Sequence, residues 1–236
     1  PFPGPGPPSC NIWNSEKFFW RFFPDSLVFC AEAIQALHSR RICAILKLVF
    51  CKRLSNDFSE SMVIHMKLKA NELVFFNRLL QEIAERTDLL AMDGFVQHGD
   101  TSTLWHSIAV AYYSLWIARR LRLSCRWKSL VSGALLHDYF LYDWHIPAPD
   151  HRFHGFTHPK AALRNAQRDW ALDPVQRNII ARHMFPLTPV PPRCMEGFLV
   201  CLMDKWCSLA ETFGRHRYRR LRALCGSALR REGAPC

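Results

Sequence analysis

The sequence predicts an all-α protein in which one helical bundle carries the chemistry. From about residue 67 onward, apolar residues recur at spacings of three, four and seven, which is the period of an amphipathic helix. Signals for helix starts and stops separate several such segments, and no segment shows a convincing strand pattern. The 236 residues are enough to bury a core, and we expect a domain of five to six core helices over residues 62–213.

Residues 1–61 differ from the rest of the chain in composition and pattern. They open with PFPGPGPPSC, a Pro/Gly cluster that cannot form regular structure, and continue with apolar pieces of poor periodicity. Met62 and Met66 stand just before the first well-patterned helix. We expect the native protein to start at one of them, the upstream part being a translated leader or a gene-prediction artefact; a poorly ordered extension is the alternative. N-terminal sequencing of natively expressed protein tests this, because a major species starting upstream of Met62 would refute it.

The first two expected helices lead to a candidate metal ligand. Residues 67–90 carry an apolar stripe, and HGDTST then supplies a loop in which Asp100 or Thr101 is the expected N-cap. The second helix runs to about Leu121. His106 shares one of its faces with apolar residues such as Val110, so its side chain is expected to point inward.

The next expected helix ends in a His-Asp dipeptide. Ser124 can cap this helix, which runs from Arg126 to about Phe140 with His137 on its apolar face. The stretch LYDWHIPAPDHRFHGF then forms a long Pro- and His-containing loop. Loops of this length inside a compact domain are usually functional or mobile.

Two short helices follow the loop. The first is expected to start at residue 157 or 158, with Pro159 in its first turn, and to end near Trp170. The sequence DPVQ at residues 173–176 combines a capping acid, a first-turn proline and a glutamine at the third position, which is a strong helix start. This second helix is expected to end near His183.

The last expected helix, residues 194–213, precedes a basic tail. Asp204 and Glu211 share one face of this helix, and Gly214 is its stop signal. Residues 214–236 hold seven basic residues against one acidic residue, whereas residues 62–213 hold 17 against 14. The near balance of the domain makes a nucleic-acid groove on it unlikely. We expect the tail to be a solvated helix end, with binding of anionic polymers or lipid headgroups as the alternative.

Ten cysteines and the hydropathy pattern bear on the compartment. The chain has no CxxC pair and is too rich in apolar residues to need a disulfide scaffold, so we expect reduced core cysteines and a cytoplasmic protein. No apolar run reaches the roughly 18 residues that a membrane helix needs, so no membrane association is expected.

Six side chains of metal-ligand type fall on or next to these helices. They are His106, His137, Asp138, His158, His183 and Asp204. Consecutive helical residues point about 100° apart, so His137 and Asp138 can both bind metal only near the helix end, or if the carboxylate bridges two ions. Imidazole and carboxylate together suit Fe, Mn, Co, Ni or Zn. An unpaired Asp138 in an apolar neighbourhood would be costly, which makes a cation its natural partner.

The order and setting of these six residues resemble a known superfamily. LLHD ends a helix, THPKAAL places His158 near a helix start, IIARHMFPL places His183 at a helix end, and LVCLMDKW holds Asp204. Over residues 95–213 this pattern resembles the HD-domain metal-dependent phosphohydrolases. The full order resembles their dinuclear branch, which includes the symmetrical dinucleoside-tetraphosphate hydrolases of the YqeK type and the HD-GYP phosphodiesterases.

The resemblance implies a fold, a site and a reaction. The fold would be an HD-domain helical bundle with two divalent metal ions. His106, His137, Asp138 and Asp204 would hold the first ion, and Asp138 would bridge to a second held by His158 and His183. Metal-activated hydroxide would then cleave a phosphoester or phosphoanhydride of a nucleotide or other small phosphorylated substrate. Asp138, His137 and Lys205 are the expected catalytic residues; Lys205 would contact a phosphate or, alternatively, pair with a surface acid.

Departures from the family pattern keep other readings open. Such hydrolases often carry a small residue and a lysine soon after the HD pair, but this chain has YFLYDWH, and no GYP signature follows. The expected pocket rim is therefore aromatic and His-rich: Tyr139, Tyr142, Trp144, His145, His151 and His154. His154 is an alternative to His158 as ligand, whereas His98 is expected only in a turn. A di-iron oxygenase of the same superfamily and a non-catalytic nucleotide-binding regulatory domain are the alternative functions.

Overall fold

The structure is a computed structural model, and it describes residues 66–146, 153–213 and 218–230. All of these residues belong to one compact unit, Leu48–Cys236. The elements in chain order are α5 (Ala70–Arg86), η2 (Leu89–Gly94), β1 (Val96–His98), β2 (Thr101–Ser102), α6 (Thr103–Arg120), α7 (Trp127–Leu135), α8 (His154–Asp169), α9 (Pro174–Arg182), α10 (Met195–Phe213), α11 (Arg219–Cys225) and η4 (Gly226–Leu229). The expected extension 1–61, its boundary and Met62 lie outside the described residues.

The described part is mostly helical, which confirms the all-α expectation at that level. Its assignment to the HD-domain superfamily stays a prediction. The exception to the helical pattern is an antiparallel pair of very short strands, β1 and β2, which have an irregular register and are joined through Gly99. Strands of two and three residues are too short to show alternation, so the sequence pattern did not predict them.

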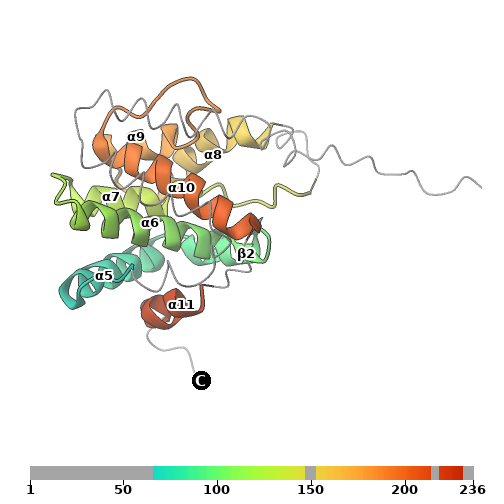
Figure 1. Cartoon of the computed structure of the whole chain (residues 1–236). Coiled ribbons are helices and arrows are strands. Elements are labelled where there is room, and N and C mark those ends of the chain that lie inside the picture. Colours follow the sequence, from blue (N-terminus) through green and yellow to red (C-terminus); the bar gives the residue numbers. More distant parts are fainter. Residues whose placement is uncertain (1–65, 147–152, 214–217, 231–236) are drawn as a thin grey trace, which may run out of the picture. The chain divides into compact units, whose positions relative to one another are not determined.

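Helix α6 is the buried centre of this unit. Almost every one of its side chains is buried, because the helix packs against α7, α10 and η2 (Figure 1). A helix that is covered on several sides carries apolar residues around most of its circumference. His106 is one of its fully buried residues, as the sequence predicted.

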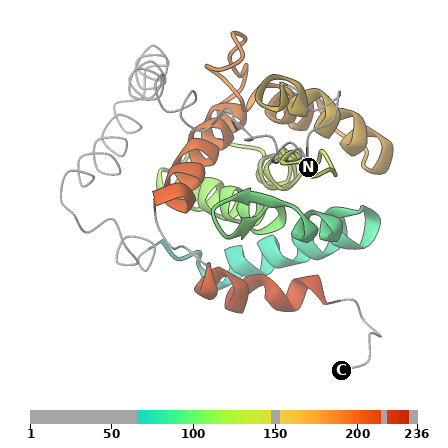
Figure 2. The ribbon, with the colours of Figure 1, turned by 90° about the vertical axis from the view of Figure 1, so that its right-hand side faces the viewer.

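Four further helices bring the other candidate ligands to α6. Helix α9 packs against both α7 and α10, and α8 packs against α9, so these helices lie on one side of α6 (Figure 2). His137 and Asp138 follow α7, and His183 is the C-cap of α9. His158 lies in the first half of α8 and Asp204 in the middle of α10.

The predicted capping box of α9 is confirmed. Asp173 is the N-cap, Pro174 is the first helical residue, and the backbone N–H of Gln176 donates to the Asp173 carboxylate at 2.8 Å. The Asp173 N–H donates in turn to the Gln176 side chain at 2.7 Å. This reciprocal pair satisfies two backbone donors and fixes where α9 begins.

Two expected helix starts are wrong. Helix α6 begins after Ser102, which makes no side-chain capping bond, because Thr101 and Ser102 belong to β2. Helix α7 is preceded by Arg126 rather than capped by Ser124, and the Arg126 N–H donates to the carboxylate of Glu196 in α10 at 2.8 Å. The acceptor at the start of α7 is therefore Glu196, which is distant in sequence, and not the nearby Ser124 that the sequence pattern suggested.

Helices α7 and α8 also have different bounds from those expected. Helix α7 ends at Leu135, so His137 and Asp138 lie in the turn that follows it rather than within the helix. Helix α8 begins at His154, which makes Pro159 an interior residue rather than a first-turn residue. Of the long loop, residues 147–152 lie outside the described part of the chain.

The C-terminal segment differs from the solvated tail that we expected. Tyr218, Leu221 and Cys225 are buried, and the Asn77 amide of α5 donates to the Leu224 carbonyl at 2.9 Å. Figure 2 shows α11 lying along α5. Residues 218–230 thus contribute to the same core as the helices before them.

The cysteines and the helices of the described residues bear on the expected compartment. The cysteines there, at positions 125, 194, 201, 207 and 225, carry free thiols, as expected. Within residues 66–146, 153–213 and 218–230, no helix combines the length and apolar character needed to cross a membrane.

Candidate metal centre

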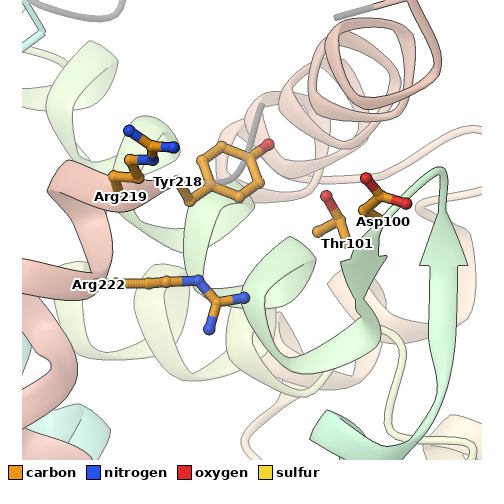
Figure 3. A pocket seen from close by; sticks show the side chains of 5 residues that line it. All are labelled: Asp100, Thr101, Tyr218, Arg219 and Arg222. Carbon is orange, nitrogen blue, oxygen red and sulfur yellow. The ribbon is translucent and has the colours of Figure 1, made fainter. Parts of the chain in front are cut away.

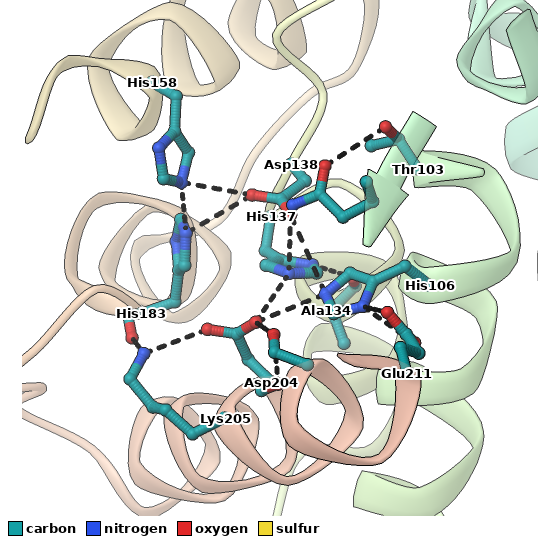
Figure 4. A network of polar contacts seen from close by, with 12 residues as sticks. Thr103, His106, Ala134, His137, Asp138, His158, His183, Asp204, Lys205 and Glu211 are labelled. Carbon is teal, nitrogen blue, oxygen red and sulfur yellow. Dashed lines mark hydrogen bonds and ion pairs between the residues drawn. The ribbon is translucent and has the colours of Figure 1, made fainter. Parts of the chain in front are cut away.

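The six side chains proposed as ligands from the sequence meet at one buried place (Figure 4). They come from α6, the turn after α7, α8, the end of α9, and α10. None of the six exposes more than 6% of its surface. They are His106, His137, Asp138, His158, His183 and Asp204.

One half of the cluster gathers around Asp204. The Oδ1 atom of Asp204 lies 3.2 Å from His106 Nε2 and 3.8 Å from His137 Nε2. The Oδ2 atom of Asp138 faces the same two rings, at 3.8 Å from His106 Nε2 and 3.3 Å from His137 Nε2. Two imidazoles and two carboxylates thus surround one point.

The other half gathers around the second oxygen of Asp138. Its Oδ1 lies 3.2 Å from His158 Nε2 and 3.4 Å from His183 Nε2. The two Nε2 atoms of these histidines are 2.9 Å apart. The Asp138 carboxylate therefore stands between two histidine pairs and directs a different oxygen to each.

The remote nitrogens of three histidines are held by backbone carbonyls. The Nδ1 atoms of His137, His158 and His183 lie 2.7, 2.8 and 2.9 Å from the carbonyl oxygens of Ala134, His154 and Ile180. A carbonyl can only accept, so each Nδ1 carries the proton, and in the neutral ring each Nε2 presents a lone pair. Lone pairs on His158 and His183 would repel each other at 2.9 Å unless a proton or a cation lies between them.

The charges of the cluster also favour a positively charged partner. Asp138, Asp204 and Glu211 are buried carboxylates, and Lys205 contacts one of them. Burial opposes protonation of His137, but Asp138 and Asp204 outweigh it and raise the pKa of His137 to about 9. Burial likewise opposes protonation of His106, yet Glu211 and Asp204 raise its pKa well above the usual range. The carboxylates therefore draw positive charge into this site.

His183 behaves differently from His106 and His137. Burial lowers the pKa of His183 to about 4, against the opposing effect of Asp138, so the ring is neutral at pH 7. Burial also opposes ionisation of Asp138, but His137 and the other rings hold the pKa of this carboxyl well below its usual value. Neutral imidazole and ionised carboxylate are the protonation states in which these groups bind metal.

Unsatisfied atoms provide a direct test of whether a metal ion fits. Among the described residues, His137 Nε2 and Asp138 Oδ1 are buried without a hydrogen-bond partner. Two overlapping groups have one ligand atom per residue within 4.8 Å of one another: His106 with His137 and Asp204, and His137 with Asp138 and His183. A donor set of imidazole and carboxylate fits a first-row transition metal or zinc. These buried groups could therefore hold a metal ion.

Lys205 lies inside the cluster rather than at its surface. Its ammonium group donates to Asp204 Oδ2 at 2.9 Å and to the carbonyl of His183. Lys205 is 5% exposed. Lys205 pairs with the buried Asp204 rather than with the surface acid that we expected as one alternative, while contact with a substrate phosphate stays a prediction.

The aromatic residues after the HD pair have more than one role. Tyr139 is fully buried and donates to Asp169 at 2.8 Å, so it is not part of a pocket rim. His154 stacks on both His158 and Trp144, with ring centroids 4.6 and 5.1 Å away. His158 is therefore the ring that faces Asp138, and His154 lies behind it. His145 is exposed and contacts Asp143, Tyr142 contacts His154 at 3.0 Å, and His151 lies outside the described residues.

Sequence reasoning missed Gln97 and Glu211, which touch the cluster, and it expected His98 only in a turn although His98 lies beside the cluster. Gln97 of β1 donates from Nε2 to Asp138 Oδ2 at 2.9 Å, and its Oε1 accepts from the Thr103 hydroxyl at 3.2 Å. Glu211 contacts His106, and the ring of His98 lies 5.8 Å from that of His106. Gln97 and His98 lie on strands too short to predict. The shared helix face of Asp204 and Glu211 was the one available signal.

Comparison with known proteins adds no assignment. No protein-family model, curated protein or solved structure matches the chain. The function must therefore be inferred from the site itself.

Proposed function

We propose that this protein is a metal-dependent phosphohydrolase of the HD-domain superfamily, acting on a nucleotide or another small phosphorylated substrate. The observation that carries the proposal is the position of Asp138, whose two oxygens face different histidine pairs. A carboxylate in this position is suited to bridging two cations. When bound, two divalent cations would lower the pKa of a shared water molecule and neutralise charge on the phosphoryl oxygens.

The protein residues divide into two ligand groups that share one carboxylate. Lys205 partly neutralises Asp204 and anchors it to the His183 carbonyl, so it positions a ligand. Burial of the whole cluster excludes bulk water and strengthens its electrostatic interactions. The proposed groups are His106, His137, Asp204 and Asp138 Oδ2 for one ion, and His158, His183 and Asp138 Oδ1 for the other.

A second candidate is a di-iron oxygenase that uses the same six ligands. Rings pack against His158, with Phe140 at 5.8 Å and His154 at 4.6 Å, and the stretch after Asp138 is aromatic where the sequences of such hydrolases often carry a lysine. An apolar shell of this kind limits solvent access, which suits oxidation of a small organic substrate.

Metal content and reaction products separate these functions. The full chain is purified, its bound metals are counted per chain, and phosphate release is measured on nucleotides and phosphodiesters with Mn²⁺, Fe²⁺ or Co²⁺. Asp138→Ala removes the bridging carboxylate. The control is Asp169→Asn, which changes a carboxylate that contacts Arg168 and Tyr139 outside the cluster.

We expect two metal ions per chain and phosphate release that is lost in Asp138→Ala but kept in Asp169→Asn. Oxygen consumption with iron, without phosphate release, would favour the oxygenase function over the hydrolase function. Tight nucleotide binding with neither activity would indicate a regulatory domain. A protein that binds no metal would refute both metal-based functions, the hydrolase and the oxygenase.

A further inference from the structure

Glu211 is a buried carboxylate that contacts a proposed ligand without being one of the six. Its Oε2 and Oε1 atoms lie 2.9 and 3.0 Å from His106 Nδ1 (Figure 4). Glu211 follows Asp204 by seven residues in α10, so both side chains lie on the same face of that helix. One helix thus contacts both nitrogens of His106, with Asp204 at Nε2 and Glu211 at Nδ1.

The carboxylate sets the state of the His106 ring. A proton on Nδ1 donates to Glu211, so that in the neutral ring the Nε2 lone pair would face Asp204 and Asp138. The other three histidines of the cluster have backbone carbonyls at this place, so His106 has the more strongly negative acceptor. A carboxylate behind a histidine fixes the ring orientation and raises its basicity as a ligand.

Glu211 is in turn held by Tyr218. The Tyr218 hydroxyl donates to Glu211 Oε1 at 2.6 Å, and the tyrosine is 8% exposed. Figure 3 shows Tyr218 on the wall of a pocket that it lines with Asp100, Thr101, Arg219 and Arg222. Tyr218 immediately precedes α11, so the C-terminal helix reaches the cluster through this one hydroxyl.

Helix α11 is anchored close to the same ligand. The Arg222 guanidinium lies over the Trp105 ring at 4.3 Å, and Trp105 is the neighbour of His106 in α6. Leu221 and Cys225 are buried beside it. The position of Tyr218 is therefore set by packing of α11 against the helices rather than by the hydroxyl alone.

We propose that Glu211 and Tyr218 are positioning residues that set the metal affinity of the half of the centre containing His106. This inference rests on the proposed function, because it assumes that His106 is a ligand. Glu211 holds the tautomer and orientation of His106, and Tyr218 holds Glu211. Losing the carboxylate should weaken binding of one ion about 10- to 100-fold, and losing the hydroxyl should weaken it less.

The test is a Co²⁺ titration of the metal-free full chain, in which calorimetry and visible absorption monitor binding. The variants are Glu211→Gln and Tyr218→Phe, which keep the shape of each side chain. Glu196→Gln is the control for the first, since Glu196 is a buried carboxylate of α10 that accepts from the Arg126 N–H. Tyr112→Phe is the control for the second, since the Tyr112 hydroxyl accepts from the Leu68 N–H away from the cluster.

We expect Glu211→Gln and Tyr218→Phe to weaken one Co²⁺ site and change its absorption while the other site and both controls keep wild-type affinity. Thermal unfolding of the metal-free variants distinguishes a positioning role from a merely structural one. A structural role would lower the stability of the metal-free protein and weaken binding of both ions together. That pattern, or wild-type affinity in both variants, would overturn the inference. If Glu211→Gln does not fold, Tyr218→Phe decides the outcome alone. A wild-type chain that binds no Co²⁺ would instead refute the proposed function.

Discussion

Asp138 uses its two carboxylate oxygens on different neighbours. Oδ1 faces His158 and His183, whereas Oδ2 faces His137 and accepts from Gln97. The sequence showed that adjacent His137 and Asp138 could not share one direction, and it left open a helix-end ion or a bridging carboxylate. The structure places the pair in the turn after α7, where the carboxylate reaches both histidine pairs.

The second histidine pair gives a prediction about stoichiometry. His158→Ala should reduce bound metal from two ions to one per chain, because it removes one of the two imidazoles beside Asp138 Oδ1. His154→Ala should keep two ions, because the His154 ring stacks on His158 without facing Asp138, and the backbone carbonyl that contacts His158 Nδ1 remains in the variant. Metal analysis after dialysis measures both. Loss of an ion in His154→Ala but not in His158→Ala would show that His154, and not His158, is the metal ligand.

Gln97 gives a second prediction at this scale. Gln97→Leu removes the amide that donates to Asp138 Oδ2, so we expect metal affinity to fall about tenfold or more. Competition with a coloured chelator measures the affinity. Gln81→Leu is the control, since Gln81 lies on the exposed side of α5 and contacts Glu85. Equal affinities in the two variants would show that Gln97 has no part in holding the carboxylate.

Residues that support the ligands could not be predicted as the ligands were. The proposed ligands were recognisable by their chemical type and by their order along the expected helices. Gln97 and Glu211 carry ordinary polar side chains, and their partners are 41 and 105 residues away in the sequence. Only the folded arrangement identifies such partners.

At the scale of elements, the close contact of α7 and α9 positions ligands from both. A Cβ atom added at Gly133 in α7 would lie 2.6 Å from Ile179 Cδ1 and 3.2 Å from Ile179 Cβ in α9. Glycine is therefore required here for the approach of two helices. His137 and His183 each follow within four residues of this contact, so the spacing of the helices sets the spacing of the ligands.

Substitution of this glycine tests the contact. Gly133→Ala should destabilise the fold by about 1–3 kcal/mol, because the added methyl group forces apart side chains that are already packed. Gly94→Ala is the control, since a Cβ there meets no atom within 4 Å. Urea unfolding of both variants measures the difference. A Gly133→Ala variant as stable as Gly94→Ala would show that α7 and α9 can separate without cost.

Helix existence was easier to predict than helix bounds. Periodicity located α5, α6, α7 and α10, and helix-start signals located α8 and α9. The DPVQ signal gave the correct start of α9 because its capping partners are close in sequence. The start of α7 could not be found in this way, since its Arg126 N–H is satisfied by Glu196 from α10. Local signals succeed where the cap is local.

For the molecule as a whole, the cluster ties together five helical segments. Its side chains come from α6, α7, α8, α9 and α10 or the turns that follow them. A bound ion would therefore stabilise the native state, in which these segments meet, against the unfolded state, in which they do not.

This coupling predicts a metal-dependent stability. At a free metal concentration about 100 times the dissociation constant, the free energy of unfolding should rise by about 2.7 kcal/mol for one site. Thermal unfolding with Co²⁺ and with chelator measures the change. Asp138→Ala should show no such increase. A wild-type unfolding temperature that does not change with added Co²⁺ would contradict the coupling.

The contact between Tyr218 and Glu211 also has a consequence for biosynthesis. His106 is translated 98 residues before Asp204, and Tyr218 follows only after α10 is complete. A nascent polypeptide that has reached His183 holds four histidines and one aspartate of the cluster but lacks α10, which supplies the second aspartate and the glutamate. Assembly of the His106 half on the ribosome must therefore await emergence of α10, and its last hydrogen bond forms when Tyr218 emerges.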